Sequence, residues 1–167
     1  MSSSVHFGHF GGVTFFALAV FVVVWSLFWF TTKGGYFFFD PQDCFDSKPT
    51  DRVLPRSAAN ATFEPMLKHY IGVTQLLVTI AAASIAFGNG QTLASPIVIA
   101  KLLLAWSIFY GVLFCAVLLW RYDEYTQNMK SYTRIWYSTV FALGISSLLC
   151  FMVGYLVWGW GLSKLIC

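Results

Sequence analysis

The side chains that could carry out chemistry in this chain are few, and their spacing does not bring them together. His6 and His9 lie before the first apolar run, and no acidic residue precedes Lys33. His69 stands at the start of the second apolar run. A protein metal site usually needs about three or four suitable ligands. The histidines therefore do not predict a metal or haem site.

Acid–base and nucleophilic groups are scattered in the same way. All seven carboxylates fall in the segments 31–69 and 121–134, outside the apolar runs. The four cysteines form no CxxC pair, and Cys115 and Cys150 lie within apolar runs, where a free thiol acts as a small apolar filler. The chain has no P-loop, GxSxG, HExxH or GxGxxG motif. We expect a non-enzymatic protein without a cofactor.

Polar and small side chains line up inside the second apolar run, 70–87. They recur at alternating steps of three and four residues, which places them on one helix face: Gly72, Gln75, Thr79, Ala82, Ala86 and Asn89. A glutamine facing lipid would leave its amide without hydrogen-bond partners, so we expect Gln75 to face protein or water. This seam is either a tight packing surface between helices or the polar lining of a path through an oligomer.

Small residues also recur every four positions in the third and fourth apolar runs. They are Ser107, Gly111 and Cys115 in the third, and Ser138, Ala142, Ser146, Cys150 and Gly154 in the fourth. Because small residues at this spacing let helix backbones approach closely in a membrane, we expect helix-packing faces here. Lys101, one turn into the third run, either extends its side chain to the membrane surface or places a positive charge at a pore mouth beside Asn89.

Helices must position these residues, because the composition is that of a membrane protein. Of 167 residues, 58 % are hydrophobic and 10 % are charged, and the mean hydropathy is +0.70. Soluble domains carry about 25 % charged residues, so a soluble enzyme, a disordered chain and a nucleic-acid-binding protein fit poorly. Four runs are long enough for the roughly 20 residues that cross a bilayer, namely 13–30, 70–87, 97–120 and 135–160. The sequence predicts one transmembrane domain, 1–167, an all-α antiparallel bundle of four helices.

Local signals mark where these helices begin and end. Ser95-Pro96 is typical of a helix start and Gly88-Asn89-Gly90 of a helix end, so the second and third helices should form an antiparallel hairpin. The interval 31–65 holds repeated Gly and Pro breakers, Glu64-Pro65 among them, and is predicted to be irregular. The third and fourth helices are predicted to continue beyond the membrane and to turn near Gln127-Asn128.

The basic residues predict the orientation of the chain. Eight Lys and Arg lie in 31–69 and 121–134, against Lys164 alone on the opposite side, with Lys101 left aside. Because cytoplasmic loops are enriched in Lys and Arg, we expect both segments in the cytoplasm and both termini outside. One observation opposes this orientation, because Asn60-Ala61-Thr62 is a glycosylation sequon and a used sequon lies outside.

Two functions follow from these expectations. The first is a homo-oligomeric, channel-like protein in which the helix over 70–87 faces the axis, Gln75 and Thr79 narrow the path, and Lys101 and Asn89 stand at its mouth. The second is a non-catalytic accessory subunit of a larger membrane complex, docked through its small-residue faces. In both cases the expected partners are the lipid bilayer and other membrane chains, identical or different, and no nucleic acid.

Overall fold

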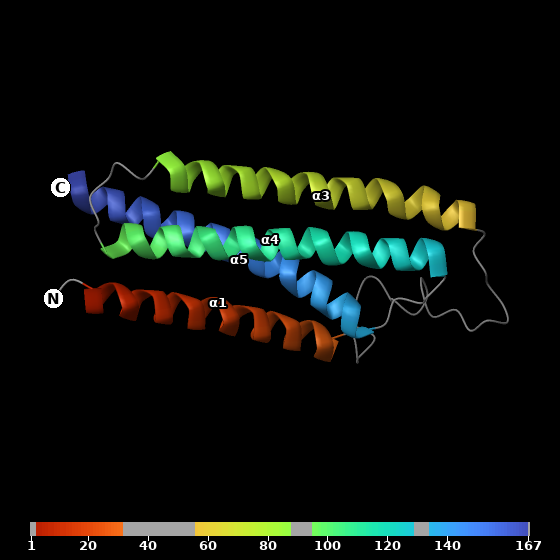
Figure 1. Cartoon of the computed structure of the whole chain (residues 1–167), viewed down its shortest axis with the longest axis horizontal. Coiled ribbons are helices and arrows are strands. Elements are labelled where there is room, and N and C mark those ends of the chain that lie inside the picture. Colours follow the sequence, from red (N-terminus) through yellow and green to blue (C-terminus); the bar gives the residue numbers. More distant parts are fainter. Residues whose placement is uncertain (1–2, 32–55, 88–94, 129–133, 167) are drawn as a thin grey trace.

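The computed structural model describes residues 3–31, 56–87, 95–128 and 134–166, and all of them are helical (Figure 1). The helices are α1 (Ser3–Thr31), α3 (Arg56–Phe87), α4 (Ser95–Asn128) and α5 (Arg134–Ile166). Each contains an apolar stretch long enough to cross a bilayer, namely Phe10–Thr31, Leu67–Ala86, Pro96–Asp123 and Ser138–Ser163. The prediction of four such helices is confirmed.

Three predicted helix boundaries agree with the structure. The second apolar helix, α3, ends at Phe87, directly before the Gly88-Asn89-Gly90 signal. The third, α4, begins at Ser95, where a small polar residue precedes proline, and runs on to Asn128. These ends were predictable because caps and breakers act through the local backbone.

The prediction that 31–65 is irregular is wrong over its last part. Helix α3 begins at Arg56 and continues through Glu64-Pro65. A proline inside a helix removes one N–H and clashes with the carbonyl four residues earlier, here that of Ala61, at a cost of about 3 kcal/mol. Pro65 precedes the apolar stretch that starts at Leu67, so water can hydrate the Ala61 carbonyl. The contacts that α3 makes beyond Leu67 offset the remaining cost.

The helices α4 and α5 form the centre of the structure. They share the most extensive helix–helix contact, while α3 packs mainly on α4, and α1 packs on α5 and α4. In Figure 1, α3 and α1 flank the central pair on opposite sides. The starts of α1 and α4 lie at the same end as the last turns of α3 and α5. Because α1 and α3 each pack along one side, few residues of their apolar stretches are fully buried in the single chain.

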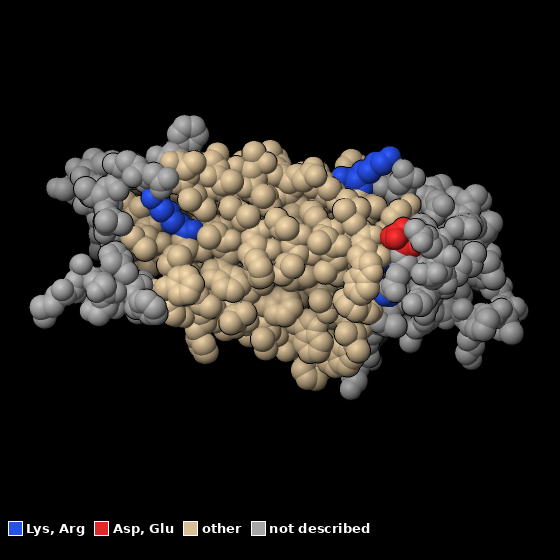
Figure 2. Space-filling view, viewed as in Figure 1, with Lys and Arg blue, Asp and Glu red and all other residues tan. Residues whose placement is uncertain are grey.

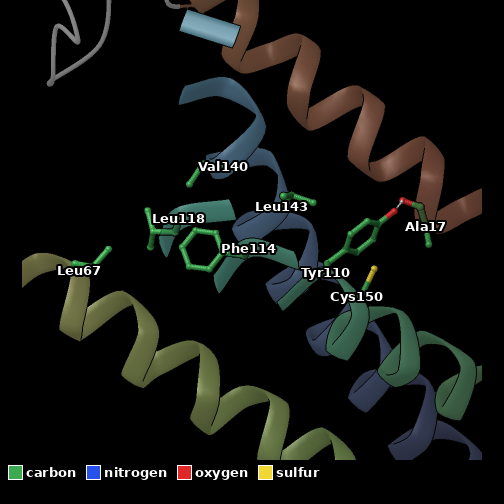
Figure 3. Packing of buried hydrophobic residues seen from close by; sticks show 8 residues of the cluster. All are labelled: Ala17, Leu67, Tyr110, Phe114, Leu118, Val140, Leu143 and Cys150. Atoms are coloured by element: carbon green, nitrogen blue, oxygen red, sulfur yellow. Dashed lines mark hydrogen bonds between the residues drawn. The ribbon is translucent and has the colours of Figure 1, made fainter. Parts of the chain in front are cut away.

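A shared core ties the four helices together (Figure 3). It consists of Ala17, Leu67, Tyr110, Phe114, Leu118, Val140, Leu143 and Cys150. The phenol of Tyr110 donates a hydrogen bond of 3.0 Å to the backbone carbonyl of Ala17, which joins α4 to α1. The ring of Phe114 lies so close to Gly144 that a Cβ there would stand 3.1 Å from the ring. The core therefore depends on a glycine facing an aromatic ring as well as on aliphatic packing.

Charge lies at the two ends of the helices and not between them. Figure 2 shows Lys and Arg at both ends of the visible face, an acidic group at one end, and uncharged surface between. The charged side chains that the structure describes are Lys68, Lys101, Arg121 and Asp123. This distribution matches the hydrocarbon region of a bilayer bounded by two polar interfaces.

Candidate functional site

One side of α3 faces α4. Leu67, Thr74 and Ala81 are buried along this side, at steps of seven residues. Gly111 of α4 permits the close approach, since a Cβ at this glycine would lie 2.9 Å from Val78 Cγ2 and 3.3 Å from Thr74 Cγ2. The contact between α3 and α4 therefore fixes the rotation of α3 about its own axis.

The small and polar seam lies outside this contact. Gln75 and Thr79 follow the contact residues Thr74 and Val78 by one position, so they lie about 100° further around the helix. The structure leaves a continuous set exposed there, which we call the polar flank of α3: Lys68, Gly72, Gln75, Thr79, Ala82 and Ala86. Asn89, which the sequence analysis assigned to the same seam, lies outside the described residues.

The polar flank points away from α5. On the other side of α3, the hydroxyl of Ser84 is hydrogen-bonded to the phenol of Tyr155 in α5. Ser84 stands two residues from Ala86, which is about 160° around the helix. The flank is therefore on the side of α3 that no described residue of α5 covers.

Helix α4 continues this exposed surface. Ser107 of α4 bonds to α5, and Ala105, two residues away, lies about 160° around from it and is exposed. Val112 and Ala116 are exposed on the same side, and the half-buried Lys101 lies on this side near the start of α4. We call the polar flank together with Lys101, Ala105, Val112 and Ala116 the α3–α4 face.

The chemistry of the α3–α4 face centres on Gln75. The hydroxyl of Thr79 donates a 2.8 Å bond to the backbone carbonyl of Gln75, so its oxygen lone pairs remain available as acceptors. Within the described part of the chain, the side-chain amide of Gln75 makes no hydrogen bond. This amide therefore offers two N–H donors and one carbonyl acceptor to whatever lies against the face.

The other small residues from the sequence analysis lie inside the protein. Ser138, Ala142 and Ser146 on α5 are fully buried, and the hydroxyls of the two serines have no hydrogen-bond partner among the described residues. Gly154 lies against α4, where a Cβ would stand 3.2 Å from Leu104 and 3.4 Å from the carbonyl of Ala100. These positions and the polar flank are thus not one site.

Two residues of this arrangement were missed by the sequence analysis. Lys68 was counted only as a basic loop residue, although it lies seven positions before Gln75 and so extends the seam. Ser147 is the partner of Ser107, whereas the four-residue pattern singled out its neighbour Ser146. The spacing from Lys68 to Gln75 was a usable signal, but nothing in the sequence indicates which serines pair across helices.

Within the helices described, no three His, Cys, Asp or Glu side chains come together. Cys115 is half-buried on α4 and Cys150 is buried on α5, both as free thiols. Comparison of the chain with protein-family models, with curated proteins and with solved structures finds no match.

Proposed function

We propose that this protein is a channel-like homo-oligomer: an antiparallel bundle of four membrane-spanning helices whose copies meet through the α3–α4 face and line a polar path with α3. The observation that carries the proposal is the outward amide of Gln75, in an apolar helix and without a hydrogen bond in the described part of the chain. The rest of the α3–α4 face consists of Thr79, the two lysines Lys68 and Lys101, and small apolar residues.

The depth of Gln75 makes its amide costly to leave against lipid. It lies eight residues beyond Leu67, the start of a 20-residue apolar stretch, so about 12 Å into the membrane. A glutamine side chain is too short to reach the headgroups from there. Placing an unpaired amide in hydrocarbon costs roughly 2–7 kcal/mol. The amide is therefore satisfied by another chain or by water held by other chains.

Self-association is the simplest way to give the Gln75 amide its hydrogen-bond partners. A primary amide both donates and accepts, so identical copies can pair their Gln75 side chains with one another. Gly72, Ala82 and Ala86 allow the backbones of neighbouring α3 helices to approach closely. A ring of Gln75 and Thr79 side chains would also hold water along the axis, as polar rings do in channels.

The decisive variant is Gln75→Leu, with Val73→Leu as its matched control. Val73 is also exposed on α3, but it stands about 160° around the helix from Gln75 and faces lipid in the proposed assembly. We expect the purified wild-type protein to form oligomers in detergent and to conduct in planar bilayers. Gln75→Leu should abolish or strongly reduce the current, whereas Val73→Leu should leave it unchanged.

Cross-linking tests the same face independently of current. A cysteine replacing Thr79 should form a disulfide between copies, and a cysteine replacing Val73 should not. A protein that stays monomeric and passes no current after purification contradicts the proposal. If it instead co-purifies with a different membrane chain that cross-links at position 79, the accessory-subunit function takes its place.

A further inference from the structure

The last two turns of α3, residues 81–87, have a surface whose shape alone does not orient the helix. They begin with three consecutive alanines, of which Ala81 is fully buried while Ala82 and Ala83 are exposed. The three methyl groups have the same size, and each lies about 100° around the helix from the one before. Turning this part of α3 about its axis would offer α4 another methyl in place of Ala81. Apolar packing therefore discriminates weakly between rotations here, since it depends on the shapes that fit together.

A directional contact lies in the same two turns. The hydroxyl of Ser84 donates a 2.8 Å hydrogen bond to the backbone carbonyl of Ile80, and it is also hydrogen-bonded to the phenol of Tyr155 in α5. Because the one O–H of Ser84 is used within α3, the phenol is the donor and Ser84 Oγ the acceptor. The bond joins α3 to α5 at the end of the structure that holds the last turns of both helices (Figure 1).

The phenol of Tyr155 is itself held in place by its neighbours on α5. The centre of its ring lies 4.7 Å from that of Phe151 and 6.1 Å from that of Trp158, and it is stacked on the latter. Ser84 stands about 140° around α3 from Thr79, so this bond and the polar flank are on different sides of the helix. A hydrogen bond weakens steeply when it bends, so a rotation of α3 that carries Ser84 away from Tyr155 breaks it.

We propose that Tyr155 is a positioning residue for the polar path, because its bond to Ser84 fixes the rotation of residues 81–87 and holds Ala82 and Ala86 on the α3–α4 face. The middle of α3 is oriented separately, by the contact of Val78 with Gly111. This inference rests on the proposed function, since it names what orients the helix that lines the path. It goes beyond that function because it gives a residue of α5 a role in the path.

The test compares the rates at which disulfides form between copies through a cysteine replacing Ala86 and a cysteine replacing Thr79, next to Val78. We expect both to form in the otherwise unchanged protein. Tyr155→Phe keeps the ring and removes only the hydroxyl, so it should slow the bond at position 86 several-fold and leave that at position 79 unchanged. A general loss of stability would slow both, so the ratio of the two rates reports the positioning role.

Changes at Ser84 test the same bond from its other end. Ser84→Ala should reproduce the effect of Tyr155→Phe, and Ser84→Thr, which keeps a hydroxyl, should retain the original ratio. Ser163→Ala removes an exposed hydroxyl of α5 and is the matched control that should change neither rate. The protein without an introduced cysteine reports any disulfide from the native thiols.

The outcomes separate this inference from the proposed function. If position 79 forms its disulfide and Tyr155→Phe leaves the ratio unchanged, Tyr155 has no positioning role and the proposed channel stands. Equal slowing at both positions, or a normal ratio in Ser84→Ala, also overturns the inference. A protein that forms no disulfide at position 79 before any change to Tyr155 overturns the homo-oligomer itself, and the inference with it.

Discussion

The hydroxyls of Ser107 and Ser147 each donate a hydrogen bond to the backbone carbonyl of the other residue, at 2.8 Å in both directions. Both serines are almost fully buried, and the pair joins α4 to α5 at the centre of the structure. Gly111 lies beside it, where a Cβ would stand 3.2 Å from Ser147 Oγ. In an apolar interior, a reciprocal bond of this kind requires the two backbones to lie close together. The small residues around it permit that approach.

Replacing either serine should therefore weaken the central pair. We expect Ser107→Ala and Ser147→Ala each to lower the free energy of unfolding by about 0.5–1.5 kcal/mol, the usual contribution of one buried hydrogen bond. The double variant should lose less than the sum of the two, because both side chains serve one contact. Reversible unfolding in mixed micelles measures these values. Ser163→Ala, at an exposed position of α5, is the control, and an equal loss there would contradict the assigned role.

A methyl group at Gly111 should separate three helices at once. Its Cβ would lie 2.9 Å from Val78 Cγ2 and within 3.3 Å of Ser147 Oγ and Thr74 Cγ2, so side chains of both α3 and α5 must give way. We expect Gly111→Ala to destabilise the protein by about 1–3 kcal/mol, as overpacking does. Gly159 is the matched control, because a Cβ there would meet nothing within 4 Å. If the two variants unfold alike, the close contact of α3 with α4 is wrong.

The attachment of α1 depends on two hydrogen bonds from aromatic side chains. Trp25 Nε1 donates to Thr139 Oγ1 at 3.2 Å, and the phenol of Tyr110 donates to the carbonyl of Ala17. Tyr110→Phe keeps the ring stacked on Phe21 and removes only the hydroxyl. We therefore expect it to lower the free energy of unfolding by about 1 kcal/mol. A double-mutant cycle of Trp25→Phe with Thr139→Val should give a coupling of about 0.6 kcal/mol. No coupling in that cycle would mean that the Trp25–Thr139 bond does not hold α1.

Arg121 should stabilise the end of α4 through its aromatic neighbours. Its guanidinium carbon lies 5.1 Å from the ring centre of Trp136 and 6.0 Å from that of Trp120, and the side chain is buried. Cation–π contacts contribute about 0.5–2 kcal/mol. We expect Arg121→Gln to lower the free energy of unfolding by that amount and also to change the tryptophan fluorescence. Val73→Leu, at an exposed position on the neighbouring helix, should do neither.

The orientation of the chain is tested at the start of α3. Because eight basic residues lie in 31–69 and 121–134, we expect a cysteine replacing Ser57 to stay unlabelled by an impermeant maleimide added outside intact cells. Asn60 should carry no glycan, and its place in a helix supports this, since used sequons lie in surface loops. Labelling of that cysteine from outside would reverse the topology.

The sequence by itself determined the four helices and most of their ends. Apolar length, the Ser95-Pro96 start and the stop before Gly88 act through solvent and the local backbone, so they can be recognised without knowing any neighbour. The prediction that the chain is irregular at Glu64-Pro65 was wrong because tertiary packing, and not a local signal, decided the structure there. A breaker signal is local, but the packing of α3 along Leu67, Thr74 and Ala81 decides whether the helix tolerates it.

Only the tertiary structure decided which way each helix faces. A repeat of three and four residues places Gln75 and Thr79 on one side of α3, yet it does not say whether that side meets α4, α5 or the surroundings. The contact of Val78 and Thr74 with Gly111 settles the rotation, turns the polar flank outward and brings Lys68 and Lys101 onto one face. The physical reason is that periodicity fixes relative angles within a helix, whereas its rotation against its neighbours depends on which side chains of other helices fit against it.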